Sequence, residues 1–173
     1  MYWDSAQNTW LQNVLADAKA NNLSVLCSSH FTPGAITPID CSFDNSIWRA
    51  LGDSMLNSEA SASVNLFING GGKFITWLVG HAHNDYLGTL ISYPEQLVVC
   101  VDTANCSNPD QSRGSAIERI KSTKSQYLFN IFGVDTYLKI IKLYRVGATN
   151  DALMRSKKQL SINYETKVVV WNS

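Results

Sequence analysis

Histidine is scarce in this chain of 173 residues, which has only three, and cysteine and proline are limited to four residues each. No two cysteines form a C-x-x-C pair, and four are few for a disulfide scaffold of this length. No apolar run reaches the ~20 residues that span a bilayer. The N-terminus lacks a basic region followed by an apolar core, so it does not match a signal peptide. We therefore expect a globular protein with no membrane partner, cytoplasmic if the sequence is full-length.

Charge is also limited, at 16% of residues, and it is divided unevenly along the chain. Residues 1–112 carry 3 basic and 10 acidic side chains, a net charge of −7, whereas residues 113–173 carry 11 basic and 4 acidic, a net charge of +7. A basic half is typical of a surface that binds phosphate or nucleic acid, and it is also typical of a solvated exterior. No aromatic-plus-basic motif accompanies the charges, so we favour the solvated exterior and do not predict a nucleic-acid partner.

Hydrophobic periodicity predicts a mixed α/β chain. A helix is expected over residues 6–21, after a capping box of Asp4 and Gln7. Helical spacing recurs over 44–57, and the glycines of "SVNLFINGGG" indicate the end of another helix. The apolar segments "LSVLC", "KFITWLV" and "QLVVCVDTA" predict strands, the first of the kind that is buried on both faces. The apolar stripe of the first helix comprises Trp10, Leu11, Val14, Leu15 and Ala18.

The remaining segments suggest one domain in three parts. Residues 1–104 form an αβ portion, in which 28–43 are expected to be a long loop. Residues 105–126 are polar and predict a surface excursion. Residues 127–173 predict a β-rich tail, in which "YLFNIFGV" and "YLKIIKLYRVG" form a hairpin through "DT" and "KVVVWN" adds a strand.

All three histidines follow a predicted strand. His30 ends "LSVLCSSH", and His81 and His83 follow "KFITWLVG". Open α/β sheets place their sites at strand ends, and neutral imidazole binds zinc, manganese and iron. In an extended segment His81 and His83 point to opposite sides, so they could address two adjacent ions. Spacing alone leaves two interpretations open, a metal site or a set of surface and hydrogen-bonded histidines.

Four segments together carry a resemblance to a known family. "VLCSSHFTP" and "LVGHAHNDYL" resemble, in order and separation, the last two metal-binding motifs of calcineurin-like metallophosphoesterases. "AQNTWLQNVLADA" is similar to a helix of that family, and "FGVDTYLKIIKLYRVGATND" is similar to the closing hairpin of its bacterial and phage members. The four segments in this order cover nearly the whole chain.

The resemblance implies a fold and a site. The fold would be a layered α/β sandwich, the C-terminal half of the family's four-layer structure with a strand-rich tail. His30 and His81 would bind one metal ion and His83 a second, with Asn84 and Asp85 as partners that orient the ligands. The ions would be divalent manganese, iron or zinc, two in the complete enzyme, and the substrate a phosphate mono- or diester hydrolysed by a two-metal mechanism.

The family's earlier motifs, D-x-H, G-D-x-x-D and G-N-H-D, do not occur in this sequence. "LGDSML" is only superficially similar to the second of them, and its spacing fits a helix face. Because three neutral imidazoles cannot balance two divalent ions, we expect this chain to be inactive alone and assign no residue a catalytic role. Its partner would be the missing N-terminal half of the domain, and exposed strand edges would also favour self-association.

Two other functions compete with this one. The chain could be a non-catalytic binding or structural module that keeps part of the fold. It could also hold a single zinc ion through Cys27, His30, His81 and His83, since Cys and His are common zinc ligands. The zinc hypothesis fails if Cys27 faces the core, as its neighbours in the strand are expected to do.

Overall fold

The computed structural model describes residues 4–39, 58–80, 86–100, 122–123, 128–147 and 159–172. These residues form two sheets and two helices, which confirms the mixed α/β class. The predicted helix over 44–57 and nearly all of the predicted polar excursion lie outside the described residues. No helix in the described part of the chain is long and apolar enough to cross a membrane.

The first sheet has five strands in the order β1-β3-β5-β4-β2. β1, β3 and β5 run parallel, while β4 pairs antiparallel with both β5 and β2. The strands are β1 (Ser24–Ser28), β2 (Ile36–Pro38), β3 (Lys73–Val79), β4 (Tyr86–Leu90) and β5 (Leu97–Cys100).

The second sheet is formed by the tail and is antiparallel throughout, in the order β6-β7-β8-β9. An Asx-type turn closes its first hairpin, because the Asp135 carboxylate accepts hydrogen bonds from the backbone N–H groups of Tyr137 and Leu138. The turn is therefore longer than the "DT" of the sequence prediction. The strands are β6 (Leu128–Asp135), β7 (Ile140–Gly147), β8 (Gln159–Asn163) and β9 (Val169–Asn172).

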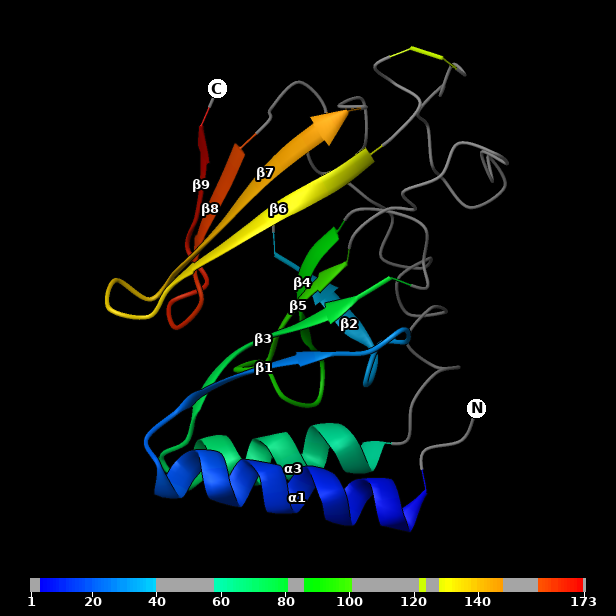
Figure 1. Cartoon of the computed structure of the whole chain (residues 1–173), viewed down its shortest axis with the longest axis vertical. Coiled ribbons are helices and arrows are strands. Elements are labelled where there is room, and N and C mark those ends of the chain that lie inside the picture. Colours follow the sequence, from blue (N-terminus) through cyan, green and yellow to red (C-terminus); the bar gives the residue numbers. More distant parts are fainter. Residues whose placement is uncertain are drawn as a thin grey trace.

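The two helices, α1 (Ser5–Ala20) and α3 (Ser58–Asn69), cover one face of the five-stranded sheet, and the four-stranded sheet covers the other (Figure 1). Alternation along β5 shows both interfaces: Val98 packs with the helices, whereas Leu97 and Val99 pack against the second sheet. The second core contains Ile75, Leu87, Leu97, Val99, Ile141, Leu143, Leu160, Ile162 and Tyr164.

Helix α1 begins where the sequence predicts, because Asp4 and Gln7 form a reciprocal capping box. Only part of the predicted stripe faces the core, however. Leu11, Leu15 and Ala18 are buried, whereas Trp10 is 62% exposed and Val14 is 40% exposed. The apolar stripe therefore coincides only in part with the buried face of α1.

Helix α3 ends at its glycines, as predicted. The backbone N–H groups of Gly70 and Gly72 donate to the carbonyls of Leu66 and Phe67, and Gly71 has a φ of 87°. A residue with a side chain rarely adopts this left-handed conformation, so the glycine lets the chain reverse directly into β3.

Three strand predictions need correction. β1 is an outer strand with no buried residue, although its apolar sequence is typical of a strand buried on both faces. The predicted loop over 28–43 contains β2, which pairs with β4. β4 and β8 were not predicted as strands, and β4 contains Gly88, which weakens a strand signal.

Candidate functional site

The first histidine and the start of the G-H-x-H segment lie side by side at one edge of the sheet. β1 and β3 run parallel, with Ser28 opposite Leu78. Their pairing continues beyond both strands, since the Ser29 N–H donates to the Leu78 carbonyl at 3.0 Å. The Gly80 N–H then donates to the His30 carbonyl at 3.2 Å. The residue before His81 is thus hydrogen-bonded to the backbone of His30.

His30 lies on an ordered loop that leaves β1. Its imidazole is exposed and packs edge-to-face on Phe31, with ring centroids 4.8 Å apart. The Ser29 hydroxyl donates to the Phe31 carbonyl, and Thr32 and Pro33 are buried. These contacts fix the loop beside His30, which is an exposed residue.

Thr32 adds an unusual polar group to this loop. Its side-chain hydroxyl is buried and has no hydrogen-bond partner among the described residues. An unsatisfied buried hydroxyl costs about 1–3 kcal/mol, so such groups usually have a partner in water, ligand or protein. The orphaned oxygen lies two residues beyond His30.

Cys27 has an environment unlike that of His30. Its side chain packs against the apolar cluster between the sheet and the helices, and burial raises the pKa of its thiol to about 12. A buried neutral thiol of this kind behaves as a small apolar side chain. This packing argues against the single-zinc hypothesis, which needs Cys27 as a thiolate beside His30.

The other predicted site residues, His81, His83, Asn84 and Asp85, lie outside the described residues. His30 is therefore the one predicted ligand whose surroundings the structure describes. Within the described ranges, no group of three or more His, Cys, Asp or Glu side chains is arranged to hold a metal ion.

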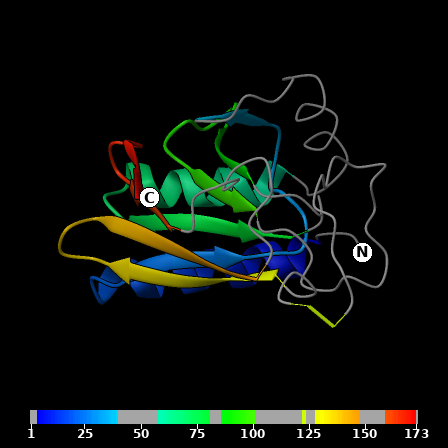
Figure 2. The same ribbon diagram turned by 90° about the horizontal axis from the view of Figure 1, so that it is seen from above.

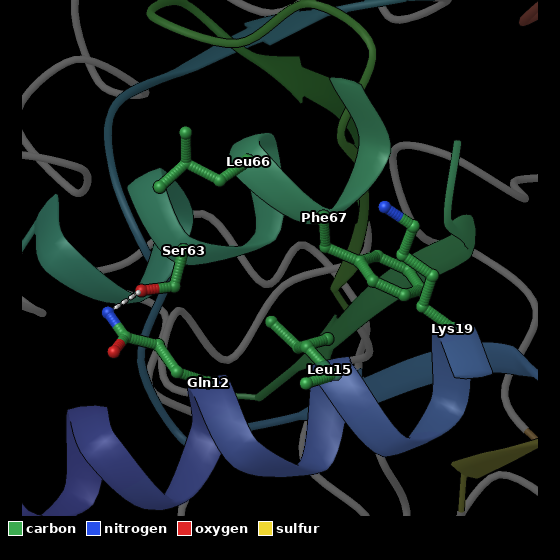
Figure 3. Close-up of a pocket in the computed structure, with 7 residues that line it drawn as sticks. Gln12, Leu15, Lys19, Ser63, Leu66 and Phe67 are labelled. Atoms are coloured by element: carbon green, nitrogen blue, oxygen red, sulfur yellow. Dashed lines mark hydrogen bonds between the residues drawn. The ribbon is translucent and has the colours of Figure 1, made fainter. Parts of the chain in front are cut away.

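A cavity of about 230 Å³ lies between the two helices (Figure 3). No predicted ligand is among the described residues that line it. Leu15 and Phe67 form its apolar floor, and Gln12 donates a hydrogen bond to the Ser63 hydroxyl at 3.2 Å. Its polar groups serve to join α1 to α3. We assign no chemistry to this cavity.

A larger cavity, of about 350 Å³, lies between the turns of the second sheet and the beginning of β3. Lys167 lines it and donates hydrogen bonds to the carbonyls of Glu95, at 2.9 Å, and Tyr164. Burial lowers the pKa of Lys167 to about 8, while Glu95 and Glu165 oppose the shift. Sequence reasoning missed this lysine, because nothing in "ETKVVV" distinguishes a half-buried cation from an exposed one.

No protein-family model matches the chain, and no curated protein matches it significantly.

Proposed function

We propose that this chain is the C-terminal portion of a metal-dependent phosphoesterase of the calcineurin-like kind. It would supply the histidine ligands of a site for phosphate mono- or diesters, and a missing N-terminal segment would supply carboxylates. The fold would accordingly be the C-terminal half of a four-layer α/β sandwich.

The observation that carries the proposal is the hydrogen bond from the Gly80 N–H to the His30 carbonyl. It joins the ends of two neighbouring parallel strands, and open α/β sheets place their ligands at this edge. His81 follows Gly80 directly in the sequence, which supports His30 and His81 as ligands of one ion.

The chemistry of the donors supports a divalent transition ion. Imidazole nitrogen is a common ligand for zinc, manganese and iron, and His30 is an exposed residue.

The predicted ligands would be shared between two ions. His30 and His81 would hold one and His83 the other, while Asn84 and Asp85 would orient the ligands through hydrogen bonds. Bound ions would supply charge stabilisation and an activated water for attack on phosphorus. Without the carboxylates that balance their charge, we expect the chain alone to bind metal and to lack turnover.

Metal content of the purified chain, expressed with manganese and zinc, tests the proposal. We expect near-stoichiometric metal in the wild type by elemental mass spectrometry and a loss of most of it in His30→Ala and His81→Ala. Ser28→Ala is the matched control, because this exposed serine lies at the same edge and is not expected to bind metal. A generic phosphate ester should not be turned over.

Three other results would count against the proposal. Metal retained by both histidine variants would place the ions elsewhere. Metal lost equally in Cys27→Ser would restore the single-zinc alternative. Absence of metal from every sample would favour a non-catalytic module.

A further inference from the structure

One side of the molecule presents the outermost element of every layer. Figure 2 shows α1, β1 and β6 stacked along this side, one from the helices and one from each sheet. Among the described residues, β1 and β6 each have a paired strand on one edge only. No described strand pairs with the backbone groups on their other edges.

The sequence of β1 does not suit an exposed edge. Parallel strands are usually covered on both faces, and the neighbouring strand β3 agrees, since residues 74–77 are all buried. No residue of β1 is buried, and Leu26 is 37% exposed. β1 also lacks the lysine or proline that protects many edge strands from association.

Helix α1 likewise exposes apolar side chains to solvent. Asn8 and Gln12 hydrogen-bond to Ser63, which places α3 on one flank of α1. Trp10 and Val14 lie at helical spacing on the flank away from Asn8 and Gln12. Both are exposed, so this flank of the helix presents apolar side chains to solvent.

We propose that this side of the molecule, formed by α1, β1 and β6, binds a second copy of the chain. A twofold axis perpendicular to the sheets would bring β1 against β1 in antiparallel pairing and Trp10 of α1 against the same helix of the other copy. The same axis direction would suit β6, whose edge lies on this side. Mixed parallel and antiparallel sheets are common, so this pairing needs no unusual geometry.

The size of the surface suits a stable dimer. Helix α1 is about 24 Å long at ~1.5 Å per residue. With layers spaced ~10 Å apart, the side measures on the order of 600 Å² before its relief is counted. A standard interface buries about 800 Å² per partner. Among residues 10, 14, 17 and 21, which share the flank, only Asp17 is charged, so like-charge repulsion is small.

Sedimentation equilibrium of the wild-type chain tests this inference, which does not depend on the proposed metal site. We expect a dimer at micromolar concentration. Trp10→Asp and Leu26→Lys should each raise the dimer dissociation constant at least about tenfold, the effect expected from losing an apolar anchor. Amide exchange of residues 24–28 should slow as the wild-type concentration rises.

The matched control is Leu66→Asp, which changes a 70% exposed leucine on α3, away from this side. It should dimerise like the wild type, and circular dichroism should show that all variants are folded. A wild-type chain that stays monomeric throughout the micromolar range would overturn the proposal and leave this surface to a different polypeptide. Dimerisation weakened only by Leu66→Asp would overturn it as well, since the interface would then lie elsewhere.

Discussion

Among single residues, Gly88 has a role that follows from close packing. β4 crosses next to β2 at this position, and a Cβ atom on residue 88 would lie 2.4 Å from Ile36 Cγ2 and 2.6 Å from the Thr37 carbonyl oxygen. The second contact is with backbone, which cannot rotate away. β2 would have to separate from β4 to accommodate any side chain here.

Gly88→Ala should therefore lower the free energy of unfolding by about 1–3 kcal/mol, the usual range for overpacking. Urea denaturation measures this change. Gly133→Ala is the control, because its added Cβ would have only ordinary contacts, the nearest at 3.9 Å. Equal effects of the two substitutions would show that the approach of β2 to β4 is not the cause.

Lys167 predicts a pH dependence. The folded chain releases the Lys167 proton near pH 8, whereas the unfolded chain retains it until near the ordinary value of 10.5. Between these values the unfolded state binds more protons, so the contribution of Lys167 to the free energy of unfolding rises with pH. Two groups act in the opposite direction, because burial raises the pKa of Cys27 from 9.0 to about 12 and that of Tyr164 above 10.0. Cys27 opposes the rise from near pH 9, and Tyr164 only at higher pH.

We expect this rise to begin near pH 8 and to be reduced by Cys27 from near pH 9, as measured by urea denaturation of the wild type. Lys167→Met should flatten it, because methionine has no proton to lose. Lys142→Met, at an exposed position of β7, should retain it. If Lys167→Met and the wild type have the same slope, Lys167 is not the titrating group.

At the scale of elements, Gln96 joins β3, α3 and the start of β5 in the core between the helices and the five-stranded sheet. It is fully buried just before β5. Its side-chain oxygen accepts from the Trp77 indole N–H of β3 at 2.9 Å, and its amide donates to the Ser61 carbonyl of α3 at 2.7 Å. One side chain thus satisfies polar groups on a strand and a helix that packs over it.

Gln96→Leu should cost about 1–3 kcal/mol of unfolding free energy, because it leaves the buried indole N–H of Trp77 without its partner and removes a hydrogen bond to the Ser61 carbonyl. Thermal or urea denaturation measures the loss. Gln12→Leu removes a hydrogen bond at an exposed position and should change stability by less than about 1 kcal/mol. A similar loss in both variants would contradict the role given to Gln96.

The elements that sequence predicted best have local signals at their ends. The capping box of Asp4 and Gln7 and the left-handed Gly71 act within a few residues, so the beginning of α1 and the end of α3 are readable from sequence. β2 lacks such a signal, since among the described strands it pairs only with β4, 50 or more residues further along the chain. Pairing of that kind is a property of the fold and not of either segment alone.

At the scale of the whole molecule, the sequence indicates which segments have an apolar face but not whether that face is covered by another layer. Trp10 and Leu26 have the spacing of core residues, yet α1 and β1 are the last elements of their layers. The candidate site was more predictable. Parallel strands end at a common edge, so the approach of Gly80 to His30 follows from recognising β1 and β3 as strands.

The most direct test of the account is the position of a bound ion. Crystals of the chain grown with zinc, measured by anomalous diffraction at the zinc edge, would locate it. The account predicts one ion bonded to the imidazoles of His30 and His81, with Zn–N distances of about 2.0–2.1 Å. An ion on Cys27, or an ion that does not contact His30, would contradict the account.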